Sequence, residues 1–437
     1  MKQAPQHPQK KRIAIIGSGI SGQTCGYLLS QQHQVTLFEA NDYLGGHTAT
    51  IDLDIDNKTL AVDTGFIVFN DRTYPNFIKL MKQVGIASKP TEMSFSVHNK
   101  VSGLEYNGHN LDTLFAQRRN LLNPRFYYFV VEILRFNRLA KKANSVIHDK
   151  QDTQGTLGEF LDQHGFSDYF ATHYVLAMTA AIWSASINSC RDFPLQFFLR
   201  FLSNHGLLDI ANRPQWYVIK GGSRSYIPKL TQSIQDIRLS SAVASVTRHD
   251  GHVDITSNHK IESFDEVIFA CHSNQALALL KDPSTTESQV LGAIKYRNND
   301  VVLHTDNSLL PTHNKTYASW NYCIDPQVDE LPTLTYNMNI LQGLKTEQDL
   351  CVTLNQTKRI DPQHILRRFT YAHPVFSVES IAAQSQRHTI CGNNLTHFCG
   401  AYWYNGFHED GVKSALDVCQ RFGITLDTIT QQGTANA

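Results

Sequence analysis

The sequence lacks a surplus of charge, because its 437 residues carry 39 Lys and Arg against 39 Asp and Glu. A balanced chain gives no electrostatic signal for nucleic acid, and we expect no nucleic-acid partner. It also lacks an apolar run long enough to span a membrane, and its polar start does not resemble a signal sequence. These absences favour a cytoplasmic protein.

Cysteines and histidines in metal-binding or redox spacing are missing as well. The eight cysteines include no C-x-x-C, which predicts reduced, unpaired thiols. The tightest group of histidines, His249, His252 and His259, matches no zinc pattern, so we predict no metal site. No G-x-S-x-G occurs to indicate a nucleophilic serine, and no second G-x-G-x-x-G to bind a nicotinamide cofactor.

What the chain does contain is a glycine-rich turn near its start. The sequence GSGISG at 17–22 follows a short apolar run at 12–16 and precedes an expected helix at 21–31. Gly17 permits the tight turn, Gly19 lets a pyrophosphate approach the backbone, and Gly22 lets helix and strand pack closely. Because a helix N-terminus points its N–H groups at phosphates, this pattern predicts a dinucleotide site.

Two further signals narrow the dinucleotide to FAD. Glu39 ends the next expected strand, at 35–38, where its carboxylate would accept hydrogen bonds from ribose hydroxyls. An acid there suits the unphosphorylated ribose of FAD or NAD rather than that of NADP. A second glycine pair, Gly45-Gly46, and the sequence DTGF at 63–66 then follow, and together they indicate FAD.

The rest of the chain continues an alternation of strands and helices. We expect strands at 58–62, 216–219, 264–271 and 396–400, a hairpin of 242–248 with 252–256, and helices at 226–235, 274–281 and 412–422. The last helix would begin at Gly411, with its N-terminus near negative charge on a reduced flavin.

This order predicts an α/β fold with two domains. The first is a discontinuous, Rossmann-like FAD-binding domain of the glutathione-reductase type, formed by 1–72, 216–283 and 386–437. The second is an α+β substrate domain with a helical insertion, in which 73–215 supply the helical part and 284–385 the sheet part.

With these motifs in place, the chain resembles the flavin-containing amine oxidase superfamily, which includes monoamine oxidases, protoporphyrinogen oxidase and phytoene desaturases. It is similar in particular to a bacterial subgroup of predicted NAD/FAD-binding proteins, often encoded beside cyclopropane-fatty-acid-synthase-like enzymes. That closer resemblance rests on VDTGFIVFN at 62–70, QRRN at 117–120, AIWS at 181–184, NHGLL at 204–208 and RPQW at 213–216.

The resemblance implies a set of FAD-binding residues. They are Gly17, Gly19, Ile20, Ser21, Gly22, Glu39, Ala40, Gly45, Gly46, His47, Thr48, Thr64, Gly65, Phe66, Val243, Gly400, Gly411 and Val412. Two positions depart from the superfamily. His47 stands where Arg is frequent, and Asp300, before the apolar run 301–303, stands where many amine oxidases have an oxygen-activating Lys. The second departure favours a dehydrogenase over an oxidase.

The substrate side is expected from aromatic helices. In a helix at 124–142, Phe126, Val130 and Ile133 share one face, and Arg135, Arg138 and Lys142 share another. Residues 195–202 are almost wholly apolar. These helices are either an acyl pocket beside a basic surface that contacts the inner face of a membrane, or ordinary packed helices with a solvated basic face.

The cluster YWYNGFHED at 402–410 is expected beside the flavin ring, with His408 and Tyr404 as candidate catalytic residues. Its two acids have a simpler role available at the helix start. We therefore predict FAD-dependent dehydrogenation of an apolar small molecule, of the fatty-acyl or another lipid class, with the electron acceptor (oxygen, a quinone or a protein) left open. The alternatives are an amine oxidase that uses oxygen, and a flavin isomerase or redox-sensing protein without net oxidation.

Overall fold

A five-stranded parallel sheet forms the centre of one half of the molecule in this computed structural model, which describes residues 10–149, 155–183, 186–209, 212–325 and 333–428. Its strand order is β10-β2-β1-β14-β20. The bounds are β1 Arg12–Ile16, β2 Gln34–Phe38, β10 Asp236–Arg238, β14 Glu266–Phe269 and β20 Thr396–Phe398. The strands come from three separate parts of the chain, so this half is discontinuous, as the sequence predicts.

Helices and a small antiparallel sheet surround these strands. Helix α1 packs against α15 and α10, and the apolar residues of β1 are buried between the layers. The antiparallel sheet consists of β11 Val243–His249, β12 His252–Ser257 and β13 Lys260–Phe264. The helices are α1 Ile20–Leu29, α2 Pro75–Gln83, α10 Ile227–Thr231, α11 Ser273–Leu279, α12 Thr285–Gly292, α14 Val378–Ser385 and α15 His408–Arg421.

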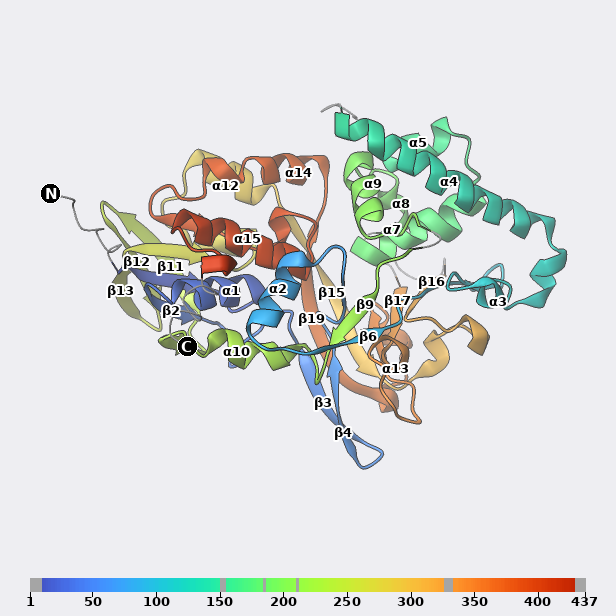
Figure 1. The fold of residues 1–437 in the computed structure, drawn as a ribbon, viewed down its shortest axis with the longest axis horizontal. Helices are drawn as coiled ribbons and strands as arrows, with labels where there is room; N and C mark the ends of the chain where they lie inside the picture. Colours follow the sequence, from blue (N-terminus) through green and yellow to red (C-terminus); the bar gives the residue numbers. More distant parts are fainter. Residues whose placement is uncertain (1–9, 150–154, 184–185, 210–211, 326–332, 429–437) are drawn as a thin grey trace.

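The other half contains a seven-stranded sheet and a helical part (Figure 1). The sheet order is β19-β15-β18-β17-β16-β7-β8. Its strands are β7 Phe95–Asn99, β8 Leu104–Asn107, β15 Lys295–His304, β16 Trp320–Ile324, β17 Thr333–Asn337, β18 Cys351–Leu354 and β19 Ile365–Val375, with the short α13 Met338–Leu341 beside it. The helical part consists of α3 Leu111–Leu114, α4 Pro124–Asp149, α5 Leu157–Gln163, α6 Asp168–Phe170, α7 Leu176–Trp183, α8 Ile187–Cys190 and α9 Leu195–Asn204.

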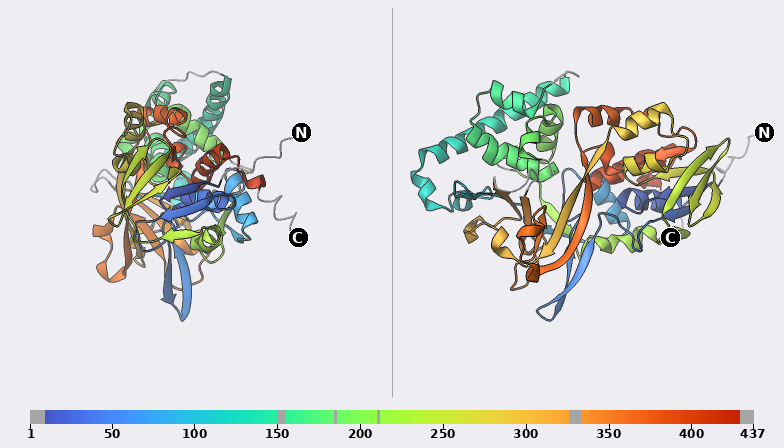
Figure 2. Two further views of the ribbon diagram at one scale, coloured as in Figure 1. Left: turned by 90° about the vertical axis from the view of Figure 1, so that its left-hand side faces the viewer. Right: turned by 180° about the vertical axis from the view of Figure 1, so that it is seen from behind.

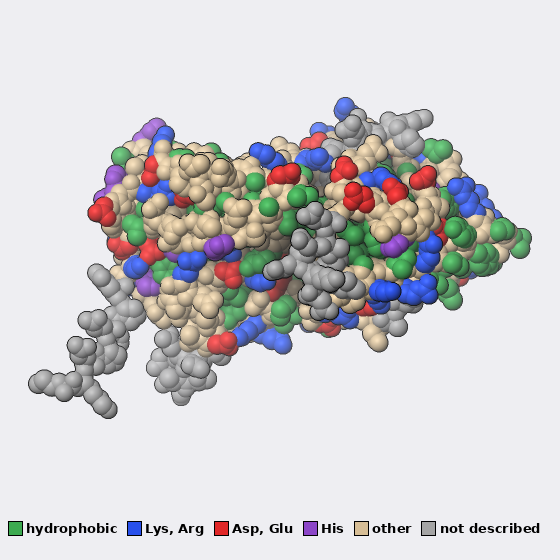
Figure 3. All heavy atoms as spheres, turned by 90° about the horizontal axis from the view of Figure 1, so that it is seen from above, with side chains coloured by type: hydrophobic (Ala, Val, Ile, Leu, Met, Phe, Trp, Pro, Cys, Tyr) green, Lys and Arg blue, Asp and Glu red, His purple; other side chains and the backbone are tan. Residues whose placement is uncertain are grey.

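Short strands and the long pair β15–β19 connect the two halves (Figures 1 and 2). The sheet β5-β9-β6 is formed by β5 Phe69–Asn70, β6 Ser88–Thr91 and β9 Trp216–Ile219. The hairpin of β3 Thr50–Ile55 and β4 Lys58–Asp63 projects from the molecule in every ribbon view. In Figure 3 hydrophobic side chains gather at the end of the molecule that the helical part forms.

The apolar residues of 195–202 belong to the core. Every apolar side chain of α9 from Leu195 to Leu202 is buried. Burial of one large side chain of this kind contributes roughly 2–3 kcal/mol, so α9 is a packed helix of the core rather than an open channel wall. The first face predicted for 124–142 is buried or partly buried too.

Several predicted boundaries are wrong. The expected strand at 264–271 is two strands, because Phe264 ends β13 and Glu266 starts β14. The strand expected at 301–303 begins six residues earlier, at Lys295, because it pairs with β19 along its whole length. The block 73–215 is not only helical, since β7 and β8 lie in the seven-stranded sheet.

The last helix also begins earlier than predicted, at His408 instead of Gly411. The reason is local: the carboxylate of Asp410 accepts a hydrogen bond from the backbone N–H of Phe407 at 2.9 Å, which caps the helix three residues upstream. The helix expected at 226–235 ends at Thr231, and strand β10 follows it.

The described helices include none that is long and apolar enough to cross a membrane. All eight cysteines are free thiols, which confirms the prediction of unpaired cysteines. Ser184 of the AIWS motif and the outermost residues of the predicted domains, 1–9 and 429–437, lie outside the described residues.

Candidate active site

Two glycine segments face each other where the parallel strands end. Gly17 and Gly45 have backbone φ angles of +104° and +127°, which residues with a side chain rarely adopt. A Cβ on Gly46 would lie 3.3 Å from the Cα of Gly19, so the two segments are in close contact. A Cβ on Gly19 would meet nothing within 4 Å. The protein thus leaves open the position at which the sequence predicts the pyrophosphate.

Other glycines of the set are required by the packing of the chain. A Cβ on Gly22 would lie 1.9 Å from the carbonyl oxygen of Gly17, and one on Gly65 would lie 2.1 Å from that of His47. Gly22 therefore sets the contact of α1 with the preceding turn. Gly65 fixes the DTGF segment against the second glycine pair.

Glu39 is buried at the end of β2. Its carboxylate accepts hydrogen bonds from the backbone N–H groups of Ser18, at 3.0 Å, and Asn41, at 2.9 Å. The backbone N–H of Ser241 donates to the carbonyl of Glu39 at 2.8 Å, which brings the residues before Val243 beside this carboxylate. Exposed Ala40 follows directly. The predicted ribose and adenine contacts are therefore neighbours.

The C-terminal helix is tied to the glycine-rich turn. Ser21 Oγ donates to the carbonyl of Gly411 at 2.9 Å, and a Cβ on Gly411 would lie 2.6 Å from Ile20. The backbone N–H of Gly400 donates to Ser414 Oγ at 2.8 Å, and Val412 is fully buried. The structure thus brings the N-terminal and C-terminal members of the predicted FAD set together.

His47 provides a test of whether these residues fit FAD. Its Nε2 is buried and has no hydrogen-bond partner among the described residues. Burial lowers the pKa of His47, so its imidazole is neutral. A buried donor without a partner, beside an open glycine backbone, suits a polar cofactor. We find that the residues present fit FAD, with a neutral imidazole where the superfamily often has Arg.

The remaining predicted residues contact a ring of aromatic side chains. Thr64 Oγ1 lies 3.0 Å from the hydroxyl of Tyr371, and Thr48 Oγ1 lies 2.5 Å from that of Tyr226. The ring of Phe66 stacks on His408 at a centroid distance of 3.7 Å. These contacts order the segments that follow the second glycine pair.

A cavity lies next to His47, between the seven-stranded sheet and the helical part. The ring of His373, which lines it, lies 5.6 Å from that of His47. His373 stands opposite Arg297 in the pairing of β15 with β19. The lining residues are Trp183, Ser189, Phe193, Arg297, Asn299, His373, Pro374, Val375 and Phe376. Five of these nine residues are apolar and four are polar, and one of the polar residues, Arg297, is a cation.

The polar groups of this cavity have defined states. Asn299 Nδ2 donates to His373 Nδ1 at 3.2 Å, so the ring proton of a neutral His373 is on Nε2. Burial lowers the pKa of His373 to about 3. Among the described residues, Arg297 forms no ion pair with a carboxylate. Its guanidinium is thus available to an anion.

The two predicted catalytic residues have other partners. The hydroxyl of Tyr404 donates to Asp417 at 2.6 Å, on α15. His408 Nε2 lies 2.5 Å from the hydroxyl of Tyr226, and burial lowers the pKa of His408 well below its usual value. Neither residue lines the cavity. Their catalytic roles stay predictions, and the contacts favour a role in packing.

The neighbouring acids cap two helices. Glu409 accepts from the backbone N–H of Phe77 at 2.8 Å, at the start of α2, and Asp410 caps α15 itself. Burial raises the pKa of Asp410 to about 7 and that of Glu409 above its usual value. The contacts of Glu409 and Asp410 therefore agree with a role in capping helices.

Asp300, which stands where many amine oxidases are expected to have an oxygen-activating lysine, does not line the cavity. Asp300 is exposed on β15, whereas the preceding Asn299 is buried and lines the cavity. Lys295 begins the strand and is exposed. None of the described residues that line the cavity is a lysine.

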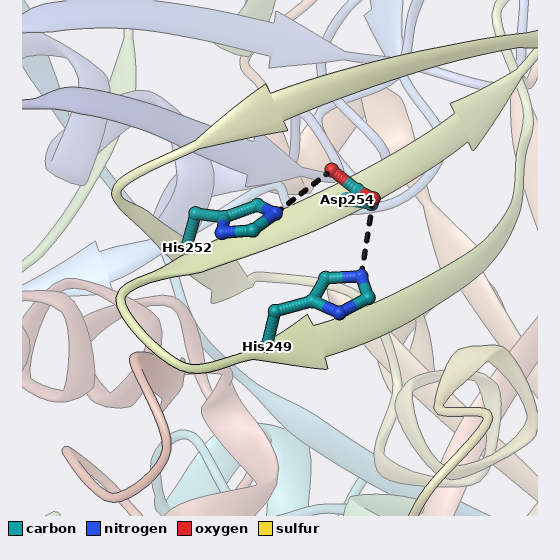
Figure 4. Close-up of side chains that lie close together, drawn as sticks. All are labelled: His249, His252 and Asp254. Atoms are coloured by element: carbon teal, nitrogen blue, oxygen red, sulfur yellow. Dashed lines mark hydrogen bonds and ion pairs between the residues drawn. The ribbon is translucent and has the colours of Figure 1, made fainter.

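A histidine cluster lies outside this site (Figure 4). His249 Nε2 and Asp254 are 3.1 Å apart, and the ligand atoms of His249, His252 and Asp254 all lie within 4.8 Å of one another. His259, at the next turn, is not a member. Asp254 also accepts a hydrogen bond from Ser263 at 2.7 Å, so its carboxylate is shared by polar side chains of all three strands of the sheet β11-β12-β13.

Comparison with known proteins now adds to this geometry. A family model described as flavin containing amine oxidoreductase matches residues 20–422. The chain belongs to this family. It is accordingly an FAD-dependent oxidoreductase, and the prediction of FAD is confirmed. No curated protein matches the chain.

Solved structures with the same fold belong to proteins of different activities. Cyclohexylamine oxidase from Brevibacterium oxydans IH-35A has a TM-score of 0.68 at 16% identity, covering 95% of this chain and 100% of that one. A fatty acid isomerase from P. acnes, described as producing CLA, has a TM-score of 0.66 at 15% identity, covering 94% and 98%. Putrescine oxidase has a TM-score of 0.64 at 13% identity, covering 94% and 99%.

Sequence reasoning missed the cavity. Arg297, Asn299 and His373 carry no motif, and they meet because of the register between β15 and β19. The useful signal was the long polar start of β15, RNND at 297–300, in front of an apolar run. Buried strands seldom begin with such residues unless they face a cavity or a ligand.

Proposed function

We propose that this flavin amine oxidoreductase family member dehydrogenates an apolar acid of the fatty-acyl class. The observation that carries the proposal is the cavity beside His47, with its aromatic walls and with Arg297, which forms no ion pair among the described residues. Mostly apolar walls with a few placed polar groups are the usual design of a small-molecule site.

The walls suit an acyl chain. Phe193, Phe376 and Trp183 contribute flat apolar surfaces, and the rings of Phe376 and Phe197 of α9 stack at 5.0 Å. An acyl chain gains roughly 0.8 kcal/mol for each methylene that it buries. The site would therefore prefer a substrate with a long hydrocarbon part.

Arg297 suits a carboxylate. A guanidinium binds a carboxylate through two parallel hydrogen bonds, and these strengthen where water is excluded. The same cation repels an ammonium group. This argues against the amine oxidase alternative, although cyclohexylamine and putrescine oxidases share the fold.

Dehydrogenation removes a hydride and a proton from the substrate. Bound FAD supplies the hydride acceptor at N5 of its isoalloxazine ring. We assign the proton to Nδ1 of His373, its unprotonated ring nitrogen, which would exchange its 3.2 Å hydrogen bond from the Asn299 amide for the substrate proton. A base of such low pKa suffices, because loss of a hydride makes the neighbouring C–H strongly acidic.

Isomerisation is the second candidate, because a fatty acid isomerase shares this fold. The same cavity and the same Arg297 would serve it. The two reactions differ only in whether electrons leave the protein, so an electron acceptor (oxygen, a quinone or a protein) is needed for dehydrogenation alone.

An anaerobic titration of the FAD-loaded protein tests the proposal. We expect long-chain unsaturated fatty acids to bleach the visible absorbance of the flavin, while alkylamines and putrescine leave it unchanged. A shifted double bond by mass spectrometry without lasting bleaching would establish the isomerase instead. Bleaching by amines and not by acids would refute both lipid candidates.

Arg297→Gln makes the test residue-specific. We expect KM for a fatty acid to rise about 10- to 100-fold, since a hydrogen bond to a charged group contributes roughly 1.5–3 kcal/mol, with kcat nearly unchanged. Arg297→Lys should restore part of the affinity. The matched control is Arg368→Gln, an exposed arginine on β19. An equal KM in the Arg297 and Arg368 variants would exclude the carboxylate contact.

A further inference from the structure

One surface of the helical part exposes large apolar side chains in a stripe. On α4 these are Tyr127, Tyr128, Val131 and Leu134, and the turn before α4 adds Leu121 and Leu122. Leu122 is 90% exposed and the others are between 44% and 56% exposed. Together these six residues, the α4 stripe, are half of the twelve large hydrophobics that are exposed in the described chain.

The helix explains why the α4 stripe exists beside a buried face. Spacings of three, four and seven residues place Tyr127, Val131 and Leu134 on one side of a helix. The opposite side of α4 holds Phe126, Phe129 and Phe136, which are fully buried. α4 is therefore apolar on two faces, and its own domain covers only one of them. Scattered exposed hydrophobics are ordinary, but a contiguous patch marks a contact surface.

Cations predominate among the described charged residues of α4 and the turn before it, although Arg118 pairs with Asp112 and Lys141 with Asp209. Exposed cations are Arg118, Arg119, Arg125, Arg138, Lys141 and Lys142. The acidic side chain described on α4, Glu132, is buried and accepts a hydrogen bond from the backbone N–H of Ser167 at 2.8 Å. Figure 3 shows Lys and Arg side chains beside the hydrophobic end of the molecule.

We propose that the α4 stripe docks this protein on the surface of an anionic lipid bilayer. Apolar side chains flanked by cations are the two signals that stable interfacial binding requires. Tyrosines suit the same position, because an aromatic body enters the lipid while the hydroxyl stays at the headgroups. The flanking arginines and lysines attract anionic headgroups.

A bilayer explains the charge better than a second copy of the chain does. A symmetric contact through the α4 stripe would bring the same cations of two copies together, and like charges across an interface repel. A negatively charged surface neutralises them instead. The α4 stripe thus selects an anionic partner with an apolar interior.

The position of α4 connects this surface with the cavity. α4 packs on α9, and Phe197 of α9 stacks on Phe376, which lines the cavity. If the substrate is an acyl compound, as proposed above, the docked helical part lies between the bilayer and the site that uses the lipid. This link to the cavity rests on the proposed function, whereas docking itself depends on the surface alone.

Vesicle flotation of the full-length, FAD-loaded protein tests docking. We expect it to float with vesicles of phosphatidylglycerol and phosphatidylethanolamine at least about tenfold more than with phosphatidylcholine vesicles, and to lose binding in high salt. The stripe variant Leu122→Ser/Tyr128→Ser/Val131→Ser and the charge variant Arg138→Glu/Lys142→Glu should both stay unbound. The control variant Ile261→Ser/Val378→Ser, which changes exposed apolar residues elsewhere, should float like wild type.

Two results would overturn the proposal. One is wild-type protein that does not float with anionic vesicles, and the other is a stripe variant that floats as well as the control. Light scattering identifies the rival occupant: a wild-type dimer that the stripe variant converts to monomer, without vesicle binding, assigns the stripe to self-association. Flavin bleaching by fatty acids in vesicle-free solution reports separately on the proposed function.

Discussion

The FAD-binding half and the substrate half of this protein are specified in different ways. In the first, the predicted cofactor site is built from backbone, and single glycines such as Gly22 and Gly65 are required by local contacts. In the second, the cavity is built from side chains on separate elements, such as Arg297 and Trp183. A short stretch of sequence therefore predicts the cofactor, whereas the residues that could bind a substrate can be found only when the pairing of the strands is known.

The largest expected effect is unfolding of the FAD-binding half by a substitution at Gly22. In Gly22→Val the added side chain would overlap the carbonyl of Gly17, where even a Cβ would lie at 1.9 Å. We expect a loss of more than about 4 kcal/mol in the free energy of unfolding, measured as failure to recover folded protein by circular dichroism. A well-folded Gly22→Val protein would show that α1 can move away from β1.

A pH dependence comes next in size. Burial raises the pKa of Asp410 to about 7, from an ordinary value of 3.8. The folded state therefore holds this proton more tightly, and stability is lost as pH rises from about 4 through about 7. Asp410→Asn removes the effect. We expect it to stabilise the protein by roughly 2–4 kcal/mol at pH 8 and by little at pH 4.5, in denaturant titrations at both pH values.

Asp63 tests whether that pH dependence is particular to Asp410. Burial raises its pKa to about 6, but Thr50, Ser223 and Gln342 all donate to its carboxylate. Asp63→Asn should destabilise the protein at neutral pH, because an amide cannot accept so many hydrogen bonds. Equal behaviour of the two Asn variants would contradict this distinction.

A smaller effect separates cofactor binding from folding. In Gly19→Ala the new methyl group points into the open space where the pyrophosphate is expected. We expect FAD affinity to fall about 10- to 100-fold, the result of a loss of roughly 1.4–2.8 kcal/mol, while the apo protein unfolds as wild type does. Fluorescence titration with FAD measures the first and thermal unfolding of apo protein the second. An unchanged affinity for FAD would show that the pyrophosphate does not bind next to Gly19.

The smallest expected effect concerns Tyr404. Its hydroxyl donates to Asp417, so Tyr404→Phe should cost about 1 kcal/mol of stability and leave kcat within about twofold. His373→Gln, inside the cavity, should lower kcat about 100-fold or more. A large loss of kcat in Tyr404→Phe would restore the catalytic role that the sequence predicts for it.

The same contrast explains which parts of the fold are predictable. Short patterns predict the strands at 12–16 and 35–38 and the hairpin turn at 250–251. An apolar run ended by glycine and an Asp-Gly turn each determine the conformation of only a few residues. The start of α15 at His408 depends on a hydrogen bond between the Asp410 side chain and the backbone of Phe407. The spacing of apolar residues does not reveal such a contact.

The site divides along the same line. The glycines assigned to FAD and Glu39 could be selected from the sequence because they belong to a short recurring motif, and their contacts with FAD stay predictions. Arg297 and His373 were not, because they are far apart in sequence and meet only through the pairing of β15 with β19. The sequence also did not distinguish the buried face of α4 from its exposed face. Periodicity shows where apolar residues recur along a helix, but not which of them pack against another element.

The strand β20 has a consequence for how the protein is made. Thr396–Phe398 pair with β14 and close one edge of the parallel sheet, although the rest of that sheet has left the ribosome more than a hundred residues earlier. Until then β14 presents an unpaired edge, which is a template for association with other chains. The nascent protein therefore exposes this edge for a long interval before its own last strand covers it.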